Sequence, residues 1–459
     1  ANLSADGLDG YFDKACSKAI DLTQCATLAA NKAAADAADL AAPTTATAAA
    51  KAAAAAALAS VNSSIDMLSY LRGGSNPVFR TRVTTDTDIA GGMLGDVIGG
   101  APVYAGQPSF KYTENAYASF AAAVRATNAG AGRTGVAYAA SNDGMLHAFN
   151  GATGNEMWAY VPSMVMDRMY RLADKDYAYR HEYFVNGAPV IGDIYVPDPS
   201  PATTGTWKTV LVGGLGAGGR GYYALDITDP GNPIALWEFA NDSLGGNANL
   251  GLTFGNPVIT KRADGSWVVV FTSGYNNITP GDGNGHLFMV NANTGERVLD
   301  IATFSSGTTP AGTSTIPSGL GKINAWVDSE IDNTAKRFYG GDLLGNLWRF
   351  DTDNLVAPNQ AALRLAYFSA GGVEQPITTQ PSLAEVKYSG SRYPVIYVGT
   401  GKYLGSTDLA STATQSVYAI KDSLTNTPLG DVHADSSVVA QTLSLPAGAT
   451  DDHAPRDVT

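Results

Sequence analysis

Residues 328–334 have the types and the spacing of a calcium-binding loop. Asp328, Glu330 and Asp332 alternate at positions one, three and five of such a loop, and Thr334 would offer its main-chain carbonyl at position seven. Calcium prefers hard oxygen ligands, and these can converge on one point because the chain turns back on itself. The spacing therefore predicts a candidate calcium site.

Two residues of this loop depart from the calcium-binding pattern. Asn333 stands at position six, where a glycine makes the sharp turn, and Lys336 puts an ammonium at position nine, where an oxygen ligand is needed. Three outcomes stay open. The loop binds calcium with the help of a water or a distant acid, or it is solvated without a metal. In the third outcome Lys336 folds among the acids and replaces the cation, because its charge offsets part of their repulsion.

Aromatic and arginine side chains gather in a second segment, residues 164–183. Such side chains are common at the centres of protein interfaces. The segment interrupts the strand pattern, as residues 108–133 and 303–318 also do, and loops inserted into a rigid scaffold commonly carry its function. The candidate partner-binding residues are Tyr170, Arg171, Tyr177, Tyr179 and Arg180. Packing of the same side chains onto their own domain is the alternative that stays open.

Cys16 and Cys25 are the only cysteines of the chain. On one continuous helix they would lie about 13 Å apart, at 1.5 Å per residue, which is too far for a disulfide. A bend between them would let the pair close a small loop, as two nearby cysteines of an exported protein commonly do. We expect a disulfide in preference to two separate buried thiols, and neither cysteine has a ligand-spaced partner for a metal.

The other residues with chemical potential carry no enzyme signature. Five histidines are scattered along the chain without ligand spacing, and a structural role is the better interpretation of each. The glycine-rich residues 216–221 and 399–402 resemble phosphate-binding loops, but tight turns between strands explain their glycines better because no helix is expected to follow. We therefore expect no catalytic residue and no cofactor other than calcium.

The elements that must position these residues are short strands in a repeated order. Residues 136–162 read as strand, Ser-Asn-Asp-Gly turn, strand, Gly-Ala-Thr-Gly turn and strand, which is the order within a four-stranded blade. Similar copies follow at residues 209–239, 267–301, 337–354 and 394–422, spaced more widely than compact repeats of about 40–50 residues. Five clear copies and parts of others predict an all-β propeller of seven modified blades.

Composition narrows the classes of function. The chain has 459 residues, 51 glycines and 45% apolar residues, which suits a large core built from many short strands. A net charge of −13 argues against a basic surface for nucleic acid. No apolar run reaches the ~18 residues expected of a membrane span. Few cysteines and many Asn, Thr, Gly and Tyr residues suit an exported protein.

The first 63 residues lack the strand pattern. They are rich in alanine, which favours helix, and Pro43 separates two helical pieces. Residues 64–72 place apolar side chains at helical spacing. We predict an Ala-rich helical segment or insertion at 1–63, a lead-in helix and loop at 64–99, and the propeller at 100–459. The propeller either lacks its last closing strands or is closed by an earlier segment.

Long motifs carry a family resemblance. They are NDGMLHAFNGATGNEMWAYVPS from Asn142, LVGGLGAGGRGYYALDITDP from Leu211, GGDLLGNLWRFD from Gly340, and VGTGKYLG with SVYAIKD between residues 398 and 422. In order and in length, these motifs resemble the C-terminal propeller of the PilC/PilY family of type IV pilus proteins. The resemblance extends from about residue 64 to residue 422.

This resemblance implies an exported protein of the periplasm and cell surface that supports pilus assembly or opposes retraction, and thereby twitching motility. It implies an extracellular place at the tip of the fimbrium as an adhesin. Its partners would be minor pilins and a receptor on a host cell or an abiotic surface. Family members carry a calcium loop directly before the GDL-GNLW-FD motif, and residues 328–336 occupy that place, with Lys336 where the family pattern has an acid.

Two functions of other classes stay open. The repeats also resemble the blades of quinoprotein dehydrogenases, which use pyrroloquinoline quinone (PQQ), but such an enzyme needs an axial pocket with a cation and an acidic base. Its common pair of neighbouring cysteines is absent from this chain. The second alternative is a scaffold of the cell envelope without a pilus. We expect binding, since a rigid propeller presents its inserted loops to a partner.

Overall fold

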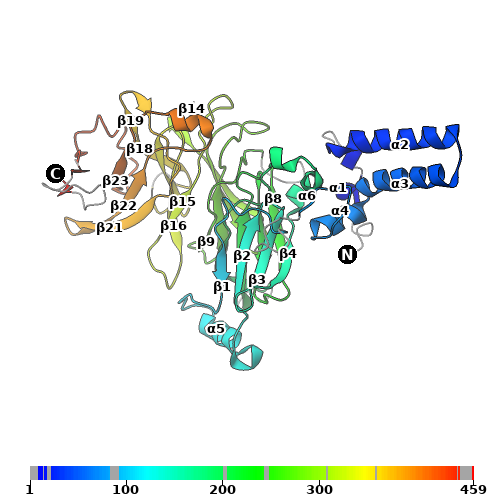
Figure 1. Cartoon of the computed structure of the whole chain (residues 1–459). Coiled ribbons are helices and arrows are strands. Elements are labelled where there is room, and N and C mark those ends of the chain that lie inside the picture. Colours follow the sequence, from blue (N-terminus) through cyan, green and yellow to red (C-terminus); the bar gives the residue numbers. More distant parts are fainter. Residues whose placement is uncertain are drawn as a thin grey trace.

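Antiparallel sheets follow one another along the chain (Figure 1). The structure is a computed structural model, and it describes residues 9–13, 15–17, 22–82, 93–199, 204–241, 248–306, 309–356, 359–441, 443–444 and 457–458. Within these residues, four sheets have four strands and a fifth has three, and neighbouring strands of each sheet are consecutive in sequence. This is the strand order that the repeats predict for a blade. The count of seven blades stays a prediction.

Every strand of the five sheets runs antiparallel to its neighbours. The first sheet consists of β1 (Val103–Ala105), β2 (Val136–Ser141), β3 (Met145–Asn150) and β4 (Glu156–Tyr160). The second consists of β5 (Val190–Pro197), β6 (Gly205–Gly214), β7 (Gly221–Asp226) and β8 (Ile234–Ala240). The third consists of β9 (Val258–Lys261), β10 (Trp267–Thr272), β11 (His286–Asn291) and β12 (Arg297–Ala302).

The fourth and fifth sheets follow the third along the chain. The fourth consists of β15 (Ile323–Val327), β16 (Ala335–Gly341), β17 (Asn346–Asp351) and β18 (Ala362–Tyr367), and the fifth of β21 (Ser382–Tyr388), β22 (Ser391–Gly399) and β23 (Val417–Lys421). Short elements lie in the connections. They are β13 (Phe304–Ser306) with β14 (Thr309–Pro310), β19 (Ser369–Ala370) with β20 (Val373–Glu374), η5 (Ser406–Ala410), and β24 (Leu443–Ser444) with β25 (Asp457–Val458).

The Asn-x-x-Thr-Gly sequences form the turns between the last two strands of a sheet. In the first sheet, Asn150 Oδ1 accepts hydrogen bonds from the main-chain N–H groups of Ala152 and Thr153 at 2.9 and 3.1 Å. Gly154 follows with a φ of 73°, a conformation that favours glycine. Residues 291–295 repeat this turn in the third sheet. The repeated motif therefore has a repeated structural role.

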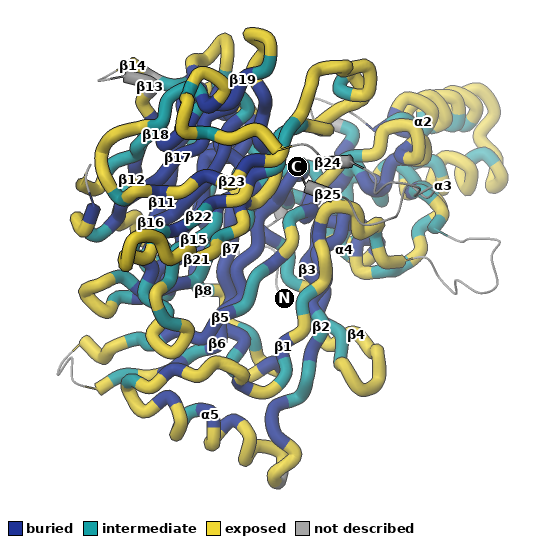
Figure 2. The backbone as a smooth tube through the Cα atoms, turned by 90° about the vertical axis from the view of Figure 1, so that its left-hand side faces the viewer, coloured by how far each residue is buried: buried dark blue, intermediate teal, exposed yellow. Residues whose placement is uncertain are grey.

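A separate apolar core lies between each pair of neighbouring sheets. Every residue of β7, β10 and β17 is buried, and Figure 2 shows the buried middle strands in dark blue. Because both faces of these sheets are covered, β10 and most of β7 read as continuous apolar runs. In β17, Asn346, Arg349 and Asp351 are buried together with apolar side chains. In the fifth sheet, β23 alternates between exposed and buried residues, so one face is covered by the fourth sheet and the other is exposed.

The N-terminal part is helical. It contains α1 (Asp9–Phe12), η1 (Ala15–Ser17), α2 (Gln24–Ala41), α3 (Thr45–Val61) and α4 (Ser64–Leu71). Helices α2 and α3 pack as a hairpin that projects away from the sheets (Figure 1). Pro43 lies in the turn between them, and the Thr44 hydroxyl accepts from the N–H of Thr47 at 3.1 Å to cap α3. None of the described helices is long and apolar enough to cross a bilayer.

The base of the helical hairpin packs on the connection between β4 and β5. That connection contains α6 (Ser163–Met166), η3 (Met169–Ala173) and η4 (Tyr177–Tyr179). Gln24 Nε2 donates to the carbonyl of Ala173 at 3.1 Å, and the Tyr70 hydroxyl donates to that of Leu172 at 3.3 Å. One core includes side chains of α1, α4, η3 and the first two sheets. The N-terminal helices are thus anchored to the sheets through this inserted connection.

A second insertion joins β1 to β2 and contains α5 (Tyr117–Ala126) and η2 (Asn128–Gly130). Its residues 110–117, here called the strap, reach sheets other than their own. The Tyr112 ring packs against the rings of Trp207 on β6 and Trp267 on β10, with centroids 5.6 and 5.3 Å apart. Trp207 Nε1 also donates to the carbonyl of Asn115 at 2.8 Å. The strap therefore connects the first sheet to the second and third.

Candidate functional site

Residues 328–336, here called the acidic loop, connect β15 to β16 in the fourth sheet. Asp328 Oδ1 accepts a hydrogen bond from Trp326 Nε1 at 2.9 Å, and its Oδ2 contacts the Lys336 ammonium. The hydrogen bond from Lys336 holds the pKa of Asp328 below its ordinary value. Lys336 therefore contacts Asp328, the first acid of the loop. This is the geometry expected if the lysine replaces the cation.

A second lysine, Lys261 at the end of β9, lies between two acids. Its ammonium donates to Glu114 Oε1 in the strap at 2.7 Å and contacts Asp332 Oδ1 in the acidic loop. The side chain is only 6% exposed. Burial lowers the pKa of Lys261, but the hydrogen bonds and charges of Asp332 and Glu114 outweigh burial, so the pKa is raised. This lysine is charged, and it connects the strap to the loop.

Main-chain hydrogen bonds also hold the acidic loop in place. The Asn333 carbonyl accepts from the N–H of Lys261 at 3.0 Å and from the Thr260 hydroxyl at 2.7 Å. The N–H of Thr113 in the strap donates to the carbonyl of Ile331 at 3.3 Å. Asn333 has a φ of 56°, so asparagine takes the left-handed conformation for which the loop pattern would use glycine. The loop is packed against both the strap and the third sheet.

The donor set of the acidic loop does not fit calcium. The Asp328 and Asp332 carboxylates contact different lysines, Glu330 is exposed, and Thr334 pairs through its main chain with Lys261. A calcium ion needs several oxygens that face one point. Within the part of the chain that the structure describes, no group of three or more His, Cys, Asp or Glu side chains is placed to hold a metal ion.

The structure divides the candidate partner-binding residues of the β4–β5 connection. Tyr170 and Tyr177 are buried in the core that the helices share with the first two sheets. The Tyr177 hydroxyl donates to the carbonyl of Glu182 at 3.1 Å, and the Arg80 guanidinium lies 4.7 Å from its ring centroid. The interpretation of these two tyrosines as surface contacts is wrong, because an aromatic residue in an inserted loop can anchor that loop to its own domain.

The other members of the set lie nearer the solvent. Tyr179 is 90% exposed, and the Arg180 side chain is 55% exposed with its guanidinium 3.7 Å from Asp174. Arg171 forms an ion pair with Glu182 at 2.8 Å and is partly buried. Of these five candidates, Tyr179 and Arg180 are therefore the two whose side chains are mostly accessible to a partner.

The structure joins Cys16 to Cys25 in a disulfide, with Cα atoms 5.5 Å apart. Cys16 belongs to η1 and Cys25 to α2, so the two cysteines lie on separate elements and not on one continuous helix. Cys16 N also donates to Asn62 Oδ1 at 3.2 Å, at the end of α3. The disulfide and this hydrogen bond therefore connect η1 to both helices of the hairpin.

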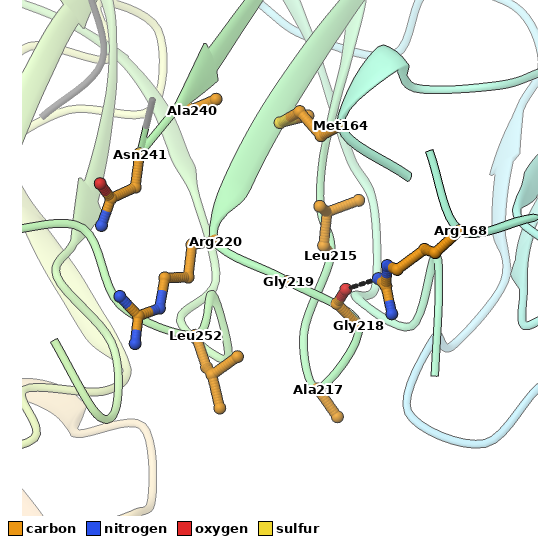
Figure 3. Close-up of a pocket in the computed structure, with 10 residues that line it drawn as sticks. All are labelled: Met164, Arg168, Leu215, Ala217, Gly218, Gly219, Arg220, Ala240, Asn241 and Leu252. Carbon is orange, nitrogen blue, oxygen red and sulfur yellow. Dashed lines mark hydrogen bonds between the residues drawn. The ribbon is translucent and has the colours of Figure 1, made fainter. Parts of the chain in front are cut away.

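A cavity of about 460 Å³ borders the glycine-rich turn at residues 216–221 (Figure 3). Its two arginines are held by main-chain carbonyls. Arg168 donates to Gly218 and Tyr183, and Arg220 donates to Asn276 at 2.8 Å and to Thr279 at 2.7 Å. Gly216 has a φ of 59°, and the residues connect β6 directly to β7. A tight turn between strands explains these glycines, as the sequence predicts.

Two buried histidines each lie between two carboxylates. The contacts join His147 to Asp143 at 3.0 Å and Glu156 at 2.6 Å, and His286 to Asp282 at 3.2 Å and Asp300 at 2.7 Å. Burial lowers the pKa of each histidine, but the acids outweigh it and raise both values. Neither pair of carboxylates converges on a metal with its histidine. Both histidines are structural, within their own sheets.

Sequence reasoning missed Glu114 and Lys261. Glu114 precedes Lys261 by 147 residues, and Lys261 precedes Asp332 by 71 residues. No local spacing indicates these pairs, since the contact is made by the packing of three separate parts of the chain. Lys336, in contrast, lies only eight residues from Asp328 and could be recognised from the loop pattern itself.

Comparisons with known proteins identify relatives of the sheet region. The type IV pilus biogenesis factor PilY1 homolog of Xylella fastidiosa is 35% identical over 375 residues, which cover 80% of this chain and 28% of that protein. The type IV pilus biogenesis factor PilY1 of Pseudomonas aeruginosa is 30% identical over 397 residues, covering 78% of this chain and 31% of that protein. The chain thus spans less than a third of the length of either relative.

A solved structure and a family model agree with these relatives. The crystal structure of the Pseudomonas aeruginosa PilY1 C-terminal domain matches with a TM-score of 0.53 and 29% identity, covering 70% of this chain and 64% of that one. The model of the PilY1 beta-propeller domain matches residues 94–447. The predicted all-β propeller and the predicted family are confirmed, and the chain belongs to the family of PilY1 β-propeller domains.

Proposed function

We propose that this chain acts in type IV pilus biogenesis by binding partners, without catalysis. The observation that carries the proposal is the family match over residues 94–447, which includes the acidic loop and the five described sheets of three or four strands. The two relatives from Xylella fastidiosa and Pseudomonas aeruginosa are type IV pilus biogenesis factors. Because the chain spans less than a third of those proteins, the activity and the partners of a whole PilY1 protein are part of this proposal.

The proposed location is outside the cytoplasm, at the cell surface and the pilus tip. The Cys16–Cys25 disulfide supports an exported chain because such bonds persist in oxidising compartments. Minor pilins at the tip and a receptor on a host cell or an abiotic surface are the proposed partners. The proposed roles are support of pilus assembly, opposition to retraction, and adhesion.

A strain that lacks the gene tests the pilus role. Surface pili and twitching motility would be counted in this strain, with and without the restored gene. We expect both to be lost and then recovered. Unchanged pili with lost attachment would reduce the role to a dispensable adhesin, whereas no change in either would contradict the proposal and favour a scaffold or an enzyme.

Tyr179 and Arg180 form the proposed adhesive surface. Replacing Tyr179 by Ala should weaken attachment at unchanged thermal stability, because the ring is exposed. Tyr177→Ala should instead lower the melting temperature, because that ring is buried. Tyr403→Ala is the matched control, since Tyr403 is also exposed but belongs to the loop after β22. Normal attachment of the Tyr179→Ala strain would contradict this assignment.

A further inference from the structure

We propose that two lysine ammonium groups close the acidic loop in place of a divalent cation, so that the junction of strap, third sheet and fourth sheet forms without calcium. The proposal concerns the folded chain alone and does not depend on the pilus role. The family resemblance implies a calcium loop at residues 328–336, and the placement of the lysines in this chain contradicts that implication.

The first argument is the division of the carboxylates. Lys336 contacts Asp328, whereas Lys261 contacts Asp332, so the two acids that a calcium ion would share are turned to separate cations. The second oxygen of Asp328 accepts from Trp326 Nε1 at 2.9 Å. Convergence of these acids on a metal would break both lysine contacts. It would also place a divalent charge beside two ammonium groups, and the repulsion would be stronger at Lys261 because that lysine is buried.

The second argument is the burial of Lys261. Its side chain is 6% exposed, and a buried ammonium requires acidic partners because it has lost most of its hydration. Glu114 supplies one partner at 2.7 Å, and Asp332 supplies the other. If a metal ion took Asp332, the lysine would be left with one acid. The loop is therefore already occupied by a cation that belongs to the chain.

The third argument is that the main chain fixes the loop independently of its acids. The Asn333 carbonyl accepts two hydrogen bonds from residues of β9, and the Ile331 carbonyl accepts one from Thr113 of the strap. These contacts position Asp332 next to Lys261 and Asp328 next to Lys336. The ion-pair partners of Asp328 and Asp332 are thus lysines of the chain itself.

The first test compares the melting temperature of the purified chain in 5 mM calcium chloride and in 5 mM EGTA at equal ionic strength. We expect the two values to agree within about 1 °C, because a ligand that does not bind the folded state does not stabilise it. Isothermal titration with calcium chloride should give no binding heat. A melting temperature that rises by several degrees in calcium and falls again in EGTA would overturn the proposal.

The second test removes the lysines. Lys261→Met should lower the melting temperature more than Lys336→Met, because Lys261 is buried between two acids and Lys336 is 35% exposed with one. Both losses should appear already in EGTA. Lys322→Met, at an exposed lysine just before β15, is the matched control and should melt as the unmodified chain does. If the melting temperature of Lys261→Met is also unchanged, the proposal that lysines take the place of the cation is wrong. If Lys261→Met does not fold, the comparison of the unmodified chain in calcium and in EGTA still tests the proposal.

Discussion

The fourth sheet has a charged junction with each of its two neighbours, and these junctions differ in exposure to water. Toward the fifth sheet, Arg349 and Asp422 pair at 2.8 Å with side chains that are 0% and 1% exposed. Toward the third sheet, Lys261 is buried, but its partner Asp332 is 51% exposed. A buried pair must be kept as a unit, whereas an exposed acid can exchange its partner for water.

The buried junction also has several further hydrogen bonds. Asp422 accepts from the Tyr339 hydroxyl and from the N–H of Leu424, both at 2.8 Å, in addition to Arg349. Arg349 donates a further bond to the carbonyl of Thr425 at 2.8 Å. The junction with the fifth sheet therefore depends on hydrogen bonds that are enclosed by protein. The junction with the third sheet depends on ion pairs whose acids are accessible to solvent and salt.

The largest expected effect follows from breaking the buried junction. Arg349→Met should lower the free energy of unfolding by about 3–5 kcal/mol, because it leaves the Asp422 carboxylate buried without its cation. Chemical denaturation measures the change. The double variant Arg349→Met, Asp422→Asn is the control and should lose less, since it removes the unpaired charge. Equal losses in both variants would show that the pair acts mainly by packing.

Removing one of the two acids that contact Lys261 should have a smaller effect on the free energy of unfolding. Glu114→Gln should lower the free energy of unfolding by about 1 kcal/mol, because Lys261 keeps Asp332 and the amide oxygen still accepts a hydrogen bond. The same denaturation experiment measures it. Glu296→Gln is a suitable control, since Glu296 is exposed in a turn of the third sheet. A loss as large as that of Arg349→Met would remove the distinction between the two junctions.

The two histidine clusters allow charge to be removed without mutation. Because the pKa of His147 and of His286 is raised in the folded chain, each histidine stabilises the fold at low pH. This contribution is fully present below the ordinary value of about 6.5 and is lost as the pH rises through the folded pKa. We expect the melting temperature to fall over that range, and the fall to be smaller in His147→Gln and His286→Gln. If the melting temperature of these variants falls with pH as steeply as that of the unmodified chain, other titratable groups cause the fall.

The smallest effect is expected at the exposed end of the acidic loop. Asp328→Asn should change the free energy of unfolding by less than about 1 kcal/mol, because Asp328 and Lys336 are both accessible to water. Sodium chloride at 0.5 M should reduce even this difference, whereas the loss in Arg349→Met should not depend on salt. A loss of several kcal/mol in Asp328→Asn would show that the contact is enclosed in solution.

The sequence predicts the elements that repeat and the contacts that are local. The Asn-x-x-Thr-Gly turns and the apolar runs of β7 and β10 indicate blades, because turn chemistry and burial leave their pattern within a few residues. The loop spacing also offers the contact of Lys336 with Asp328, as one of three outcomes that it leaves open. Lys261 and Glu114 leave no such pattern, since the folded sheets bring them to the loop from distant parts of the chain.

The sequence also does not predict which side chains of the inserted connections are buried. Tyr177 and Tyr179 are two residues apart in one short 3₁₀ segment, with Ala178 between them, yet one is buried and the other is 90% exposed. The difference arises because the N-terminal helices and Arg80 cover only one side of this segment. A side chain in an inserted loop can be assigned to packing or to binding only after its covering elements are known.

The strap affects the order in which the chain can fold. Successive sheets that contact only their neighbours can form one after another, as in repeat proteins. Tyr112, however, contacts Asn333 across 221 residues, and Thr113 pairs with Ile331. Closing such a long loop costs entropy before its contacts form, which slows folding. The strap completes its contacts only when the acidic loop of the fourth sheet is in place, so we expect the first four described sheets to complete their fold together.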